Sequence, residues 1–276
     1  MEMSIVLAIA AKEIKDATRN RWFWLYTAAF ALLSSALAAA ALLGSGFGGL
    51  AGFGRTTASM INLVLLIVPL MGLTAGTLSM AGERERGTLA YLMAQPVSRF
   101  EVFWGKFAGQ VVALVSSLVL GFALSGGLVA WRGGAAQSAL YLTLLALSAM
   151  LAVASLGLGF LISVLVRRAS AAFAISVVTW LGLAFLADLT LLGMASGMRL
   201  GAQQLFHLSL LNPLEAFRMA SIFSLRSSLD SLGPAGLYAT RTYGSATLAL
   251  FIGALALWAC LPATLSYAVF RRRSIL

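Results

Sequence analysis

Six long runs without a charged residue dominate this sequence, and each is at least 19 residues long. A helix needs about 20 mainly apolar residues to cross the hydrocarbon core of a bilayer. Of all residues, 61% are hydrophobic and only 10% are charged, whereas an ordinary soluble domain has about 25% charged residues. The sequence therefore predicts an all-α polytopic membrane protein, with 1–276 as one transmembrane domain and six spans within residues 22–54, 56–82, 107–131, 133–166, 169–187 and 242–270.

The net charge of +10 is better explained by orientation in the membrane than by a nucleic-acid partner. The basic residues stand at the ends of the spans and do not form one patch with interleaved aromatic residues. If the N-terminus is cytoplasmic, 13 of the 19 Lys and Arg residues lie on the cytoplasmic side, as the positive-inside rule requires. We therefore expect both termini in the cytoplasm and the first span to remain as an uncleaved anchor.

The N-terminal segment has the pattern of a helix that lies on the membrane. Residues 4–20 alternate apolar and charged side chains, which is typical of a helix in the inner headgroup region. We predict an interfacial helix within residues 1–21, the alternative being only a charged tail. An aromatic cluster follows where the first span enters the bilayer, made of Trp22, Phe23, Trp24 and Tyr26.

The segment 82–106 lies between two apolar spans and holds seven of the 28 charged residues of the chain, 19 basic and nine acidic. Its apolar residues recur at helical spacing and predict a short helix packed on the membrane domain: Leu89, Leu92 and Met93. Pro96 should end this helix, and a turn and a second helix should follow. We expect Glu83 and Glu85 at its N-terminal end, where the helix dipole favours carboxylates. The opposite face would be free for a soluble partner.

The segment 195–245 is the only long predicted outer loop, after a shorter glycine-rich loop at 44–58. We predict two short helices, Leu200–Leu211 and Asn212–Arg226, the second capped by its first residue with proline next. Three roles are compatible with these helices: closing a pore exit, docking an external partner or capping the bundle. The candidate contact residues are His207, Asn212, Pro213, Glu215, Phe217 and Arg218.

No set of residues for catalysis is present in the sequence. His207 is the sole histidine, which excludes His-based triads and multi-His metal sites. Gly105 and Lys106 do not complete a nucleotide-binding Walker A loop, because Phe107 follows them. We therefore assign no catalytic residue, no metal site and no bound cofactor to this chain.

Three weaker signals favour structural roles. Met194 and Met198, near His207 and Asp188 in the sequence, offer ligands that suit Cu(I), yet methionine is a common filler of helix packing. Asp188, near the end of the fifth span, is expected to have a structural role although a charge inside a span is a functional signal. Small-residue spacings predict helix packing within or between protomers, at Gly72 and Gly76, Gly105 and Gly109, and Gly193 and Gly197.

Several residues of the charged segment stand at fixed offsets: Glu83-Arg84-Glu85-Arg86-Gly87-Thr88-Leu89, then Leu92, Pro96-Val97-Ser98-Arg99 and Gly105-Lys106. This pattern resembles the signature of type-2 ATP-binding-cassette permeases, in which an acidic helix, a proline turn and a Gly-Lys pair lie between spans two and three. The resemblance implies a second copy of the chain and a separate cytoplasmic ATPase dimer that holds ATP and Mg. The residues that it assigns to ATPase coupling are Glu83, Arg84, Glu85, Arg86, Gly87, Thr88, Leu89, Tyr91, Leu92, Pro96, Ser98 and Arg99.

Within that family the chain is similar to the permease subunits of the Nos systems, which support maturation of the copper enzyme nitrous-oxide reductase in denitrifying bacteria. The residues that carry this likeness are Asn212-Pro213-Leu214-Glu215-Ala216-Phe217-Arg218 and Phe270-Arg271-Arg272-Arg273. The likeness implies the bacterial inner membrane, a homodimeric permease and a periplasmic accessory protein on the outer face.

The leading hypothesis is an ATP-driven permease, in which either a substrate crosses between two protomers or only force is transmitted to an outer partner. A scarcity of buried polar groups favours force transmission or an apolar cargo, and copper, a sulfur species and no cargo all stay open. The alternative is an ATP-independent membrane scaffold or channel subunit. A channel should line its pore with repeated polar residues, and the spans show no such repeat.

Overall fold

The computed structural model describes residues 2–44, 49–133, 138–195, 202–224, 238 and 241–272. Every regular element in these ranges is a helix, and six helices are long and apolar enough to cross a membrane. This confirms the predicted all-α polytopic class. The six are α2 (Arg21–Gly44), α3 (Gly49–Glu85), α5 (Arg99–Gly133), α6 (Ser138–Leu165), α7 (Ala169–Ala195) and α11 (Thr247–Arg272).

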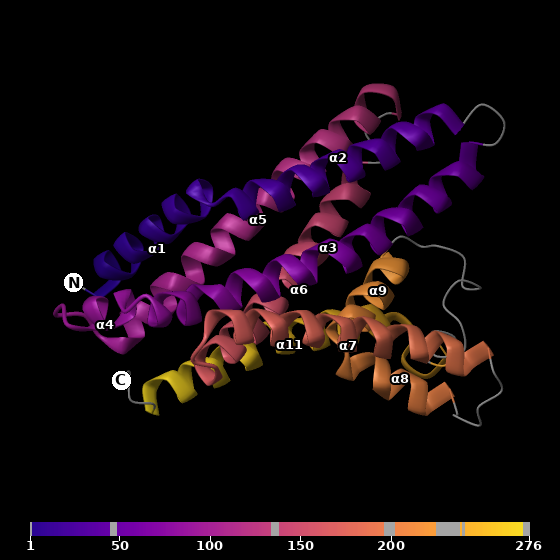
Figure 1. Ribbon diagram of the computed structural model, residues 1–276. Helices are drawn as coiled ribbons and strands as arrows, with labels where there is room; N and C mark the ends of the chain where they lie inside the picture. Colours follow the sequence, from indigo (N-terminus) through magenta and orange to yellow (C-terminus); the bar gives the residue numbers. More distant parts are fainter. Residues whose placement is uncertain are drawn as a thin grey trace.

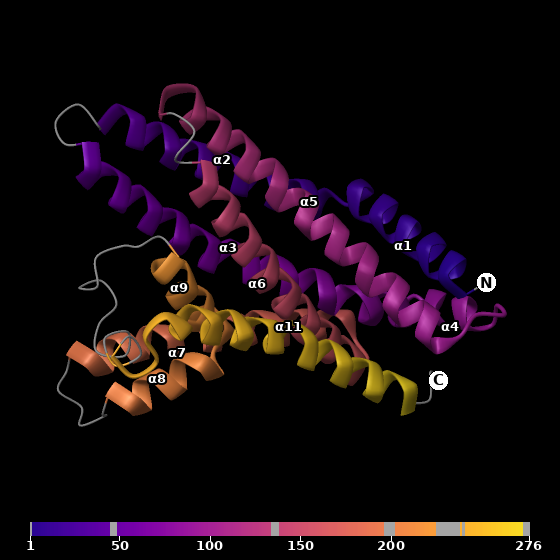
Figure 2. The ribbon, with the colours of Figure 1, turned by 180° about the vertical axis from the view of Figure 1, so that it is seen from behind.

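The shorter helices lie near the two ends of the bundle (Figures 1 and 2). Both chain ends and the short α4 gather at one end, with α1 running back along α5. At the other end, α8 lies outermost and α9 lies between α3 and α7. The bounds are Glu2–Arg19 for α1, Thr88–Met93 for α4, Ala202–Leu211 for α8, Pro213–Ser224 for α9 and Gly244–Ala246 for the 3-10 turn η4.

The helices α3 and α6 pack at very close range in the centre of the bundle. A Cβ atom added to Gly76 would stand 2.5 Å from the Leu156 carbonyl oxygen, and one added to Gly159 would stand 2.5 Å from the Leu73 carbonyl oxygen. Ser163 on α6 accepts hydrogen bonds from two backbone N–H groups near the end of α3, at 2.8 and 3.2 Å. The first small-residue spacing of the sequence therefore packs helices within one protomer.

The helix α1 packs on the first half of α5 through the second small-residue spacing. A Cβ atom on Gly105 would stand 2.8 Å from Ile9 Cβ, and one on Gly109 would stand 2.6 Å from Glu13 Cβ. Ile9 is buried, whereas Leu7 is 62% exposed, as expected for a helix with one face on the protein. The third spacing ends at Gly197, which lies outside the described residues.

The structure corrects the predicted start of the charged segment. Glu83 and Glu85 lie in the last turn of α3 and do not begin the following helix. Gly87 interrupts the chain with a left-handed φ of 73°, a conformation that glycine adopts at little cost. The short helix α4 therefore has only six residues. The N-terminal helix dipole cannot stabilise the two carboxylates, which find other partners.

A second correction concerns the outer connections. The helix α3 begins at Gly49, inside the segment 44–58 that was predicted as a loop. An α-helix satisfies its backbone hydrogen bonds within the segment, which favours helix next to an apolar medium despite several glycines. The helix α2 ends at Gly44, and the residues between α2 and α3, 45–48, lie outside the described residues.

Most of the helix α9 is buried. Asn212 Oδ1 accepts a hydrogen bond from Leu214 N at 3.0 Å, and Pro213 is the first helical residue, so the helix begins as predicted. Ala216 and Ala220 are fully buried, and α9 contacts α3, α6, α7 and α11. Its small side chains permit this close packing. Of the predicted helix, 225–226 lie outside the described residues.

Candidate functional site

The exposed turn between α3 and α5 presents a polar and aromatic surface at the end of the bundle that holds both chain ends. Tyr91 is 74% exposed, and Arg86, Thr88, Gln95 and Pro96 are exposed as well. On the other face of α4, Leu89 is fully buried, and Leu92 and Met93 pack against the core. The turn is thus attached by its apolar face, and its polar face is free for a partner.

The residues before the turn tie α3 to its neighbours. The Arg84 guanidinium donates to the carbonyl oxygens of Ser163 and Val166 at 3.3 and 3.2 Å, which are at the end of α6. A Glu85 carboxylate oxygen accepts a hydrogen bond from Ala169 N at 2.9 Å, at the first residue of α7. Both side chains therefore satisfy free backbone groups at helix ends. Neither is a freely projecting charge.

The residues after the turn tie α5 to the last helix. Arg99 donates to the carbonyl oxygens of Phe270 and Arg271 at 3.1 and 3.0 Å, close to the end of α11. Ser98 and Glu101 form a capping box at the start of α5, because Ser98 N donates to Glu101 Oε2 at 2.7 Å and Glu101 N donates to Ser98 Oγ at 3.1 Å. The turn is therefore held from both sides.

The carboxylate of Glu83 belongs to an ion network inside the protein. Its Oε1 atom lies 2.9 Å from Lys106 Nζ and 3.5 Å from Lys12 Nζ. Lys106 Nζ also donates to Glu13 Oε1, and Gln110 donates to Glu13 Oε2 at 3.1 Å. The side chain of Lys106 is 1% exposed and that of Glu13 is 5% exposed. The network joins α1, α3 and α5, so Glu83 does not face outward as predicted.

Lys12 lies on α1, outside the spans, and nearby carboxylates act on its pKa. Partial burial lowers the pKa of Lys12, but the carboxylates of Glu83, Glu13 and Asp16 raise it by more. The net result is a pKa above the ordinary value of 10.5. Lys12 therefore stays positively charged throughout the physiological pH range.

Sequence reasoning missed Glu13 and Lys106 and expected few buried polar groups. That expectation was wrong, because four ionisable side chains in the described ranges are buried: Glu13, Glu101, Lys106 and Glu215. The available signal was Lys106 itself, which stands directly before a long apolar run and needs a partner when it is buried. Its partner Glu13 lies 93 residues away in the sequence and has no local signature.

The outer candidate residues do not form a single site. Arg218 donates to Glu215 at 2.6 Å within α9, and the Glu215 side chain is only 1% exposed. Phe217 is fully buried, and Asn212 Nδ2 donates to the Leu183 carbonyl oxygen on α7 at 2.8 Å. These residues hold α9 in the bundle.

His207 stands apart from these residues, because it is exposed on α8. The described residues hold no group of three His, Cys, Asp or Glu able to bind a metal. Met198 lies outside the described residues, as do the side chains of Asp188 and Met194.

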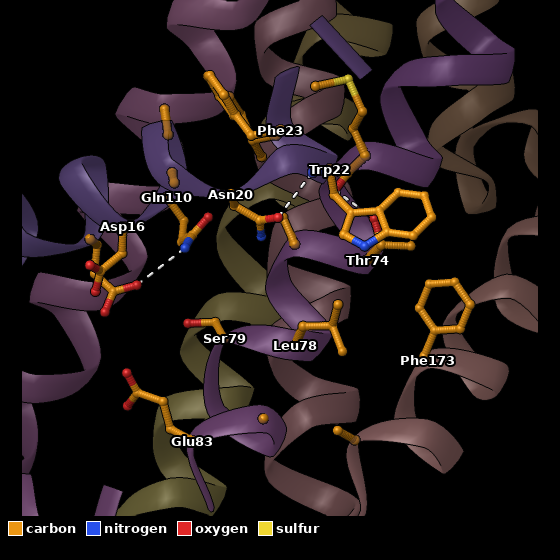
Figure 3. A pocket seen from close by; sticks show the side chains of 18 of the residues that line it. Asp16, Asn20, Trp22, Phe23, Thr74, Leu78, Ser79, Glu83, Gln110 and Phe173 are labelled. Atoms are coloured by element: carbon orange, nitrogen blue, oxygen red, sulfur yellow. Dashed lines mark hydrogen bonds between the residues drawn. The ribbon is translucent and has the colours of Figure 1, made fainter. Parts of the chain in front are cut away.

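A cavity of about 1040 Å³ lies next to the ion network, between α1, α2, α3, α5 and α7. Figure 3 shows Glu83 and Ser79 on the α3 side of this cavity, with Gln110 and Asp16 across from them. Other parts of the wall are apolar and aromatic, formed by residues that include Trp22, Phe23, Tyr26, Met71, Leu78 and Phe173. The cavity therefore combines a charged corner with a large apolar surface.

A family model described as "ABC-2 family transporter protein" matches residues 7–275. The chain belongs to the ABC-2 transporter family. The match covers all the described helices except the first residues of α1. An ABC-2 permease is the membrane subunit of a transporter, and family membership implies a cytoplasmic ATP-binding-cassette ATPase as its partner.

Two relatives of this ABC-2 permease are both named "Probable ABC transporter permease protein NosY". The relative from Stutzerimonas stutzeri is 28% identical over 285 residues, which cover 98% of this chain and 99% of the relative. The relative from Pseudomonas aeruginosa is 29% identical over 279 residues, which cover 99% of this chain and all of the relative. The likeness extends over the whole length in both cases.

Proposed function

We propose that two copies of this ABC-2 permease form the membrane unit of an ATP-driven transporter. A cytoplasmic ATPase dimer would bind the turn 86–98 of each copy and move it during ATP hydrolysis. The observation that carries this proposal is the two-sided character of α4. Leu89 is fully buried while Tyr91, two residues later, is 74% exposed, so the turn is both fixed to the bundle and open to a partner.

The contacts around the turn supply a path for force. Arg84 connects to the end of α6, Glu85 to the start of α7 and Arg99 to the end of α11. A displacement of α4 would therefore act directly on three spans besides α3 and α5. Rigid helices carry such a displacement along their axes, as in other transitions that move packed helices against one another.

The proposed orientation places both termini and α4 in the cytoplasm. The excess of basic residues on that side supports it, with 13 of 19 Lys and Arg. The outer end, with α8 and α9, would then face the periplasm and contact an accessory protein. The burial of α9 among α3, α6, α7 and α11 supports a role in passing movement to that side.

The likeness to Nos-system permeases supports a role in assembly of the copper site of nitrous-oxide reductase. Two full-length relatives carry the name NosY. In this proposal the chain binds no cofactor of its own, and ATP and Mg are held by the partner ATPase. The work done in the membrane is transport or mechanical transmission across the inner membrane.

The decisive experiment measures ATP hydrolysis by the partner ATPase with and without the permease in lipid vesicles. Tyr91→Ala and Arg86→Glu should weaken the binding of the ATPase and reduce its stimulation. Truncation of an exposed aromatic that becomes buried in an interface typically costs about 2 kcal/mol or more, which is about thirtyfold in affinity. Charge reversal at Glu83 would be a poor substitute, because this carboxylate pairs with Lys106 inside the protein.

The matched control is Trp131→Ala, which removes an aromatic side chain that is 83% exposed at the other end of α5. Its stimulation should equal that of the wild type. If Tyr91→Ala and Arg86→Glu stimulate the ATPase as well as Trp131→Ala does, the turn is not the ATPase contact. Failure of the permease to co-purify with any ATPase would favour the scaffold or channel alternative.

A further inference from the structure

The cavity beside the ion network lies at the level where several spans begin or end. Its walls include Trp22 and Tyr26 in the first turns of α2, Gly82 in the last turn of α3 and Phe173 near the start of α7. Tryptophan and tyrosine favour the headgroup level of a membrane. The cavity is therefore at headgroup depth, in the leaflet on the side of α4 and of both chain ends.

Two buried oxygens in the cavity wall have no hydrogen-bond partner. They are Ser79 Oγ and Glu83 Oε2, and Ser79 is only 8% exposed. The two lysines near Glu83 both contact its other oxygen, Oε1. Figure 3 shows Ser79 and Glu83 about one turn apart on α3, both directed toward the same part of the cavity. Because buried polar groups are almost always paired, these oxygens point to a hydrogen-bond donor from outside the chain.

The chemistry of the missing donor follows from the charges. A carboxylate oxygen next to a hydroxyl group favours a cation with several N–H donors, such as a primary ammonium group. A water molecule, which occupies about 30 Å³, would serve the two oxygens but leave most of the cavity of about 1040 Å³ empty. The remaining wall is mainly apolar and aromatic, so the same ligand should also carry an apolar part.

We propose that this cavity binds an aminophospholipid of the inner leaflet, meaning a lipid with a phosphate and a primary ammonium in its head group. The ammonium donates to Glu83 Oε2 and Ser79 Oγ. Arg19, which lines the same cavity and is exposed, binds the phosphate. The acyl chains lie against Leu78 and along α2 and α7, and α7 has the least buried surface of the six spans.

The experiment measures which lipid the purified full-length chain retains. The delipidated protein is equilibrated with vesicles of phosphatidylethanolamine, phosphatidylcholine and phosphatidylglycerol in equal amounts, and bound lipid is identified by native mass spectrometry. Phosphatidylethanolamine should exceed phosphatidylcholine about tenfold, because the trimethylammonium group has no N–H to donate to the carboxylate. No ATPase is present, so the result is independent of the proposed function.

Two variants test the residues that are assigned to the ammonium. Ser79→Ala removes one acceptor, and Glu83→Gln keeps an oxygen for Lys106 but can turn an amide donor toward the ammonium. Each should reduce the preference for phosphatidylethanolamine about two- to tenfold. The matched control is Ser116→Ala on α5, whose exposed hydroxyl bonds to the Val112 carbonyl oxygen at 2.7 Å. This control should retain the wild-type preference.

Several results would overturn the proposal. Equal retention of the three lipids by the wild type, or a preference for phosphatidylglycerol, would show that the ammonium is not recognised. Displacement of the lipid by soluble glycerophosphoethanolamine at matched concentration would show that the head group alone is the ligand. A preference unchanged in both Ser79→Ala and Glu83→Gln would place the lipid elsewhere. Measurements on the wild type alone decide whether the ammonium is recognised and whether the head group alone is the ligand, even if a variant fails to fold.

Discussion

At the scale of single residues, the most informative feature is a buried lysine with two carboxylates. Lys106 is fully buried and contacts both Glu13 and Glu83. Burial of a charge is costly unless it is paired and hydrogen-bonded, and Gln110 supplies a further hydrogen bond to Glu13. The network therefore fixes three helices in one arrangement instead of adding a general attraction between them.

Replacement of the buried lysine should cost much of the stability of this region. We expect Lys106→Met to destabilise the protein by about 3–5 kcal/mol, because the buried Glu13 and the largely buried Glu83 lose the cation nearest to both. The measurement is the thermal unfolding of the detergent-purified protein. Lys15→Met is the matched control, since Lys15 is exposed on α1, and it should change the midpoint little. Equal midpoints for the two variants would contradict the structural role of the network.

At the scale of the elements, α1 depends on glycines of α5 for its position. A Cβ atom on Gly109 would stand 2.7 Å from the Ala10 carbonyl oxygen as well as 2.6 Å from Glu13 Cβ. Backbone atoms of a helix cannot move aside as a flexible side chain can. The helices α1 and α5 therefore behave as one packed pair, and the ion network joins this pair to α3.

A larger side chain at this contact should detach α1. We expect Gly109→Leu to cost about 1–3 kcal/mol through overpacking. Local unfolding of α1 should then speed tryptic cleavage at Lys12, Lys15 and Arg19. The control is Gly127→Leu on the same helix, where an added Cβ has nothing within 4 Å. Limited proteolysis of both variants in membranes checks this prediction. Equal cleavage rates in α1 would mean that the close approach does not hold the helix.

At the scale of the whole molecule, the arrangement separates two ends with different surfaces. The end with α4 and both chain ends presents the exposed turn, the ion network and the cavity. The other end presents α8, while α9 is held inside the bundle by contacts with four spans. The helices α3 and α6 connect the two ends. Their backbones are in direct contact at Gly76 and Gly159.

The proposed orientation can be tested with single cysteines in a Cys260→Ser background, which removes the sole native thiol. Gln95→Cys on the turn should react with a membrane-impermeant maleimide only in inverted membrane vesicles. Trp131→Cys at the other end of α5 should react only in right-side-out vesicles. Both positions are exposed, so reactivity reports the side of the membrane. The reverse pattern would place α4 and both termini outside.

The sequence was sufficient for the number and type of the spans, because length and apolar content decide these locally. It also predicted the cap at Asn212 and Pro213, since capping involves neighbouring residues only. It failed at Glu83. This residue was predicted to begin the short helix and to face a partner, but it lies in the last turn of α3, and Gly87 separates it from α4. The partners of Glu83 are Lys106 on α5 and Lys12 on α1, which tertiary packing brings to the end of α3. Such a pairing between distant segments has no local signal in one sequence.

The two arginine contacts on either side of α4 have a mechanical consequence. Arg84 holds the final carbonyl groups of α6, and Arg99 holds those of α11. A force applied to α4 is therefore shared between α6 on one side and α11 on the other, and it does not act on α3 and α5 alone. In the proposed mechanism, loss of either arginine would leave α4 attached on one flank only, so the force from the ATPase would tilt the spans unevenly.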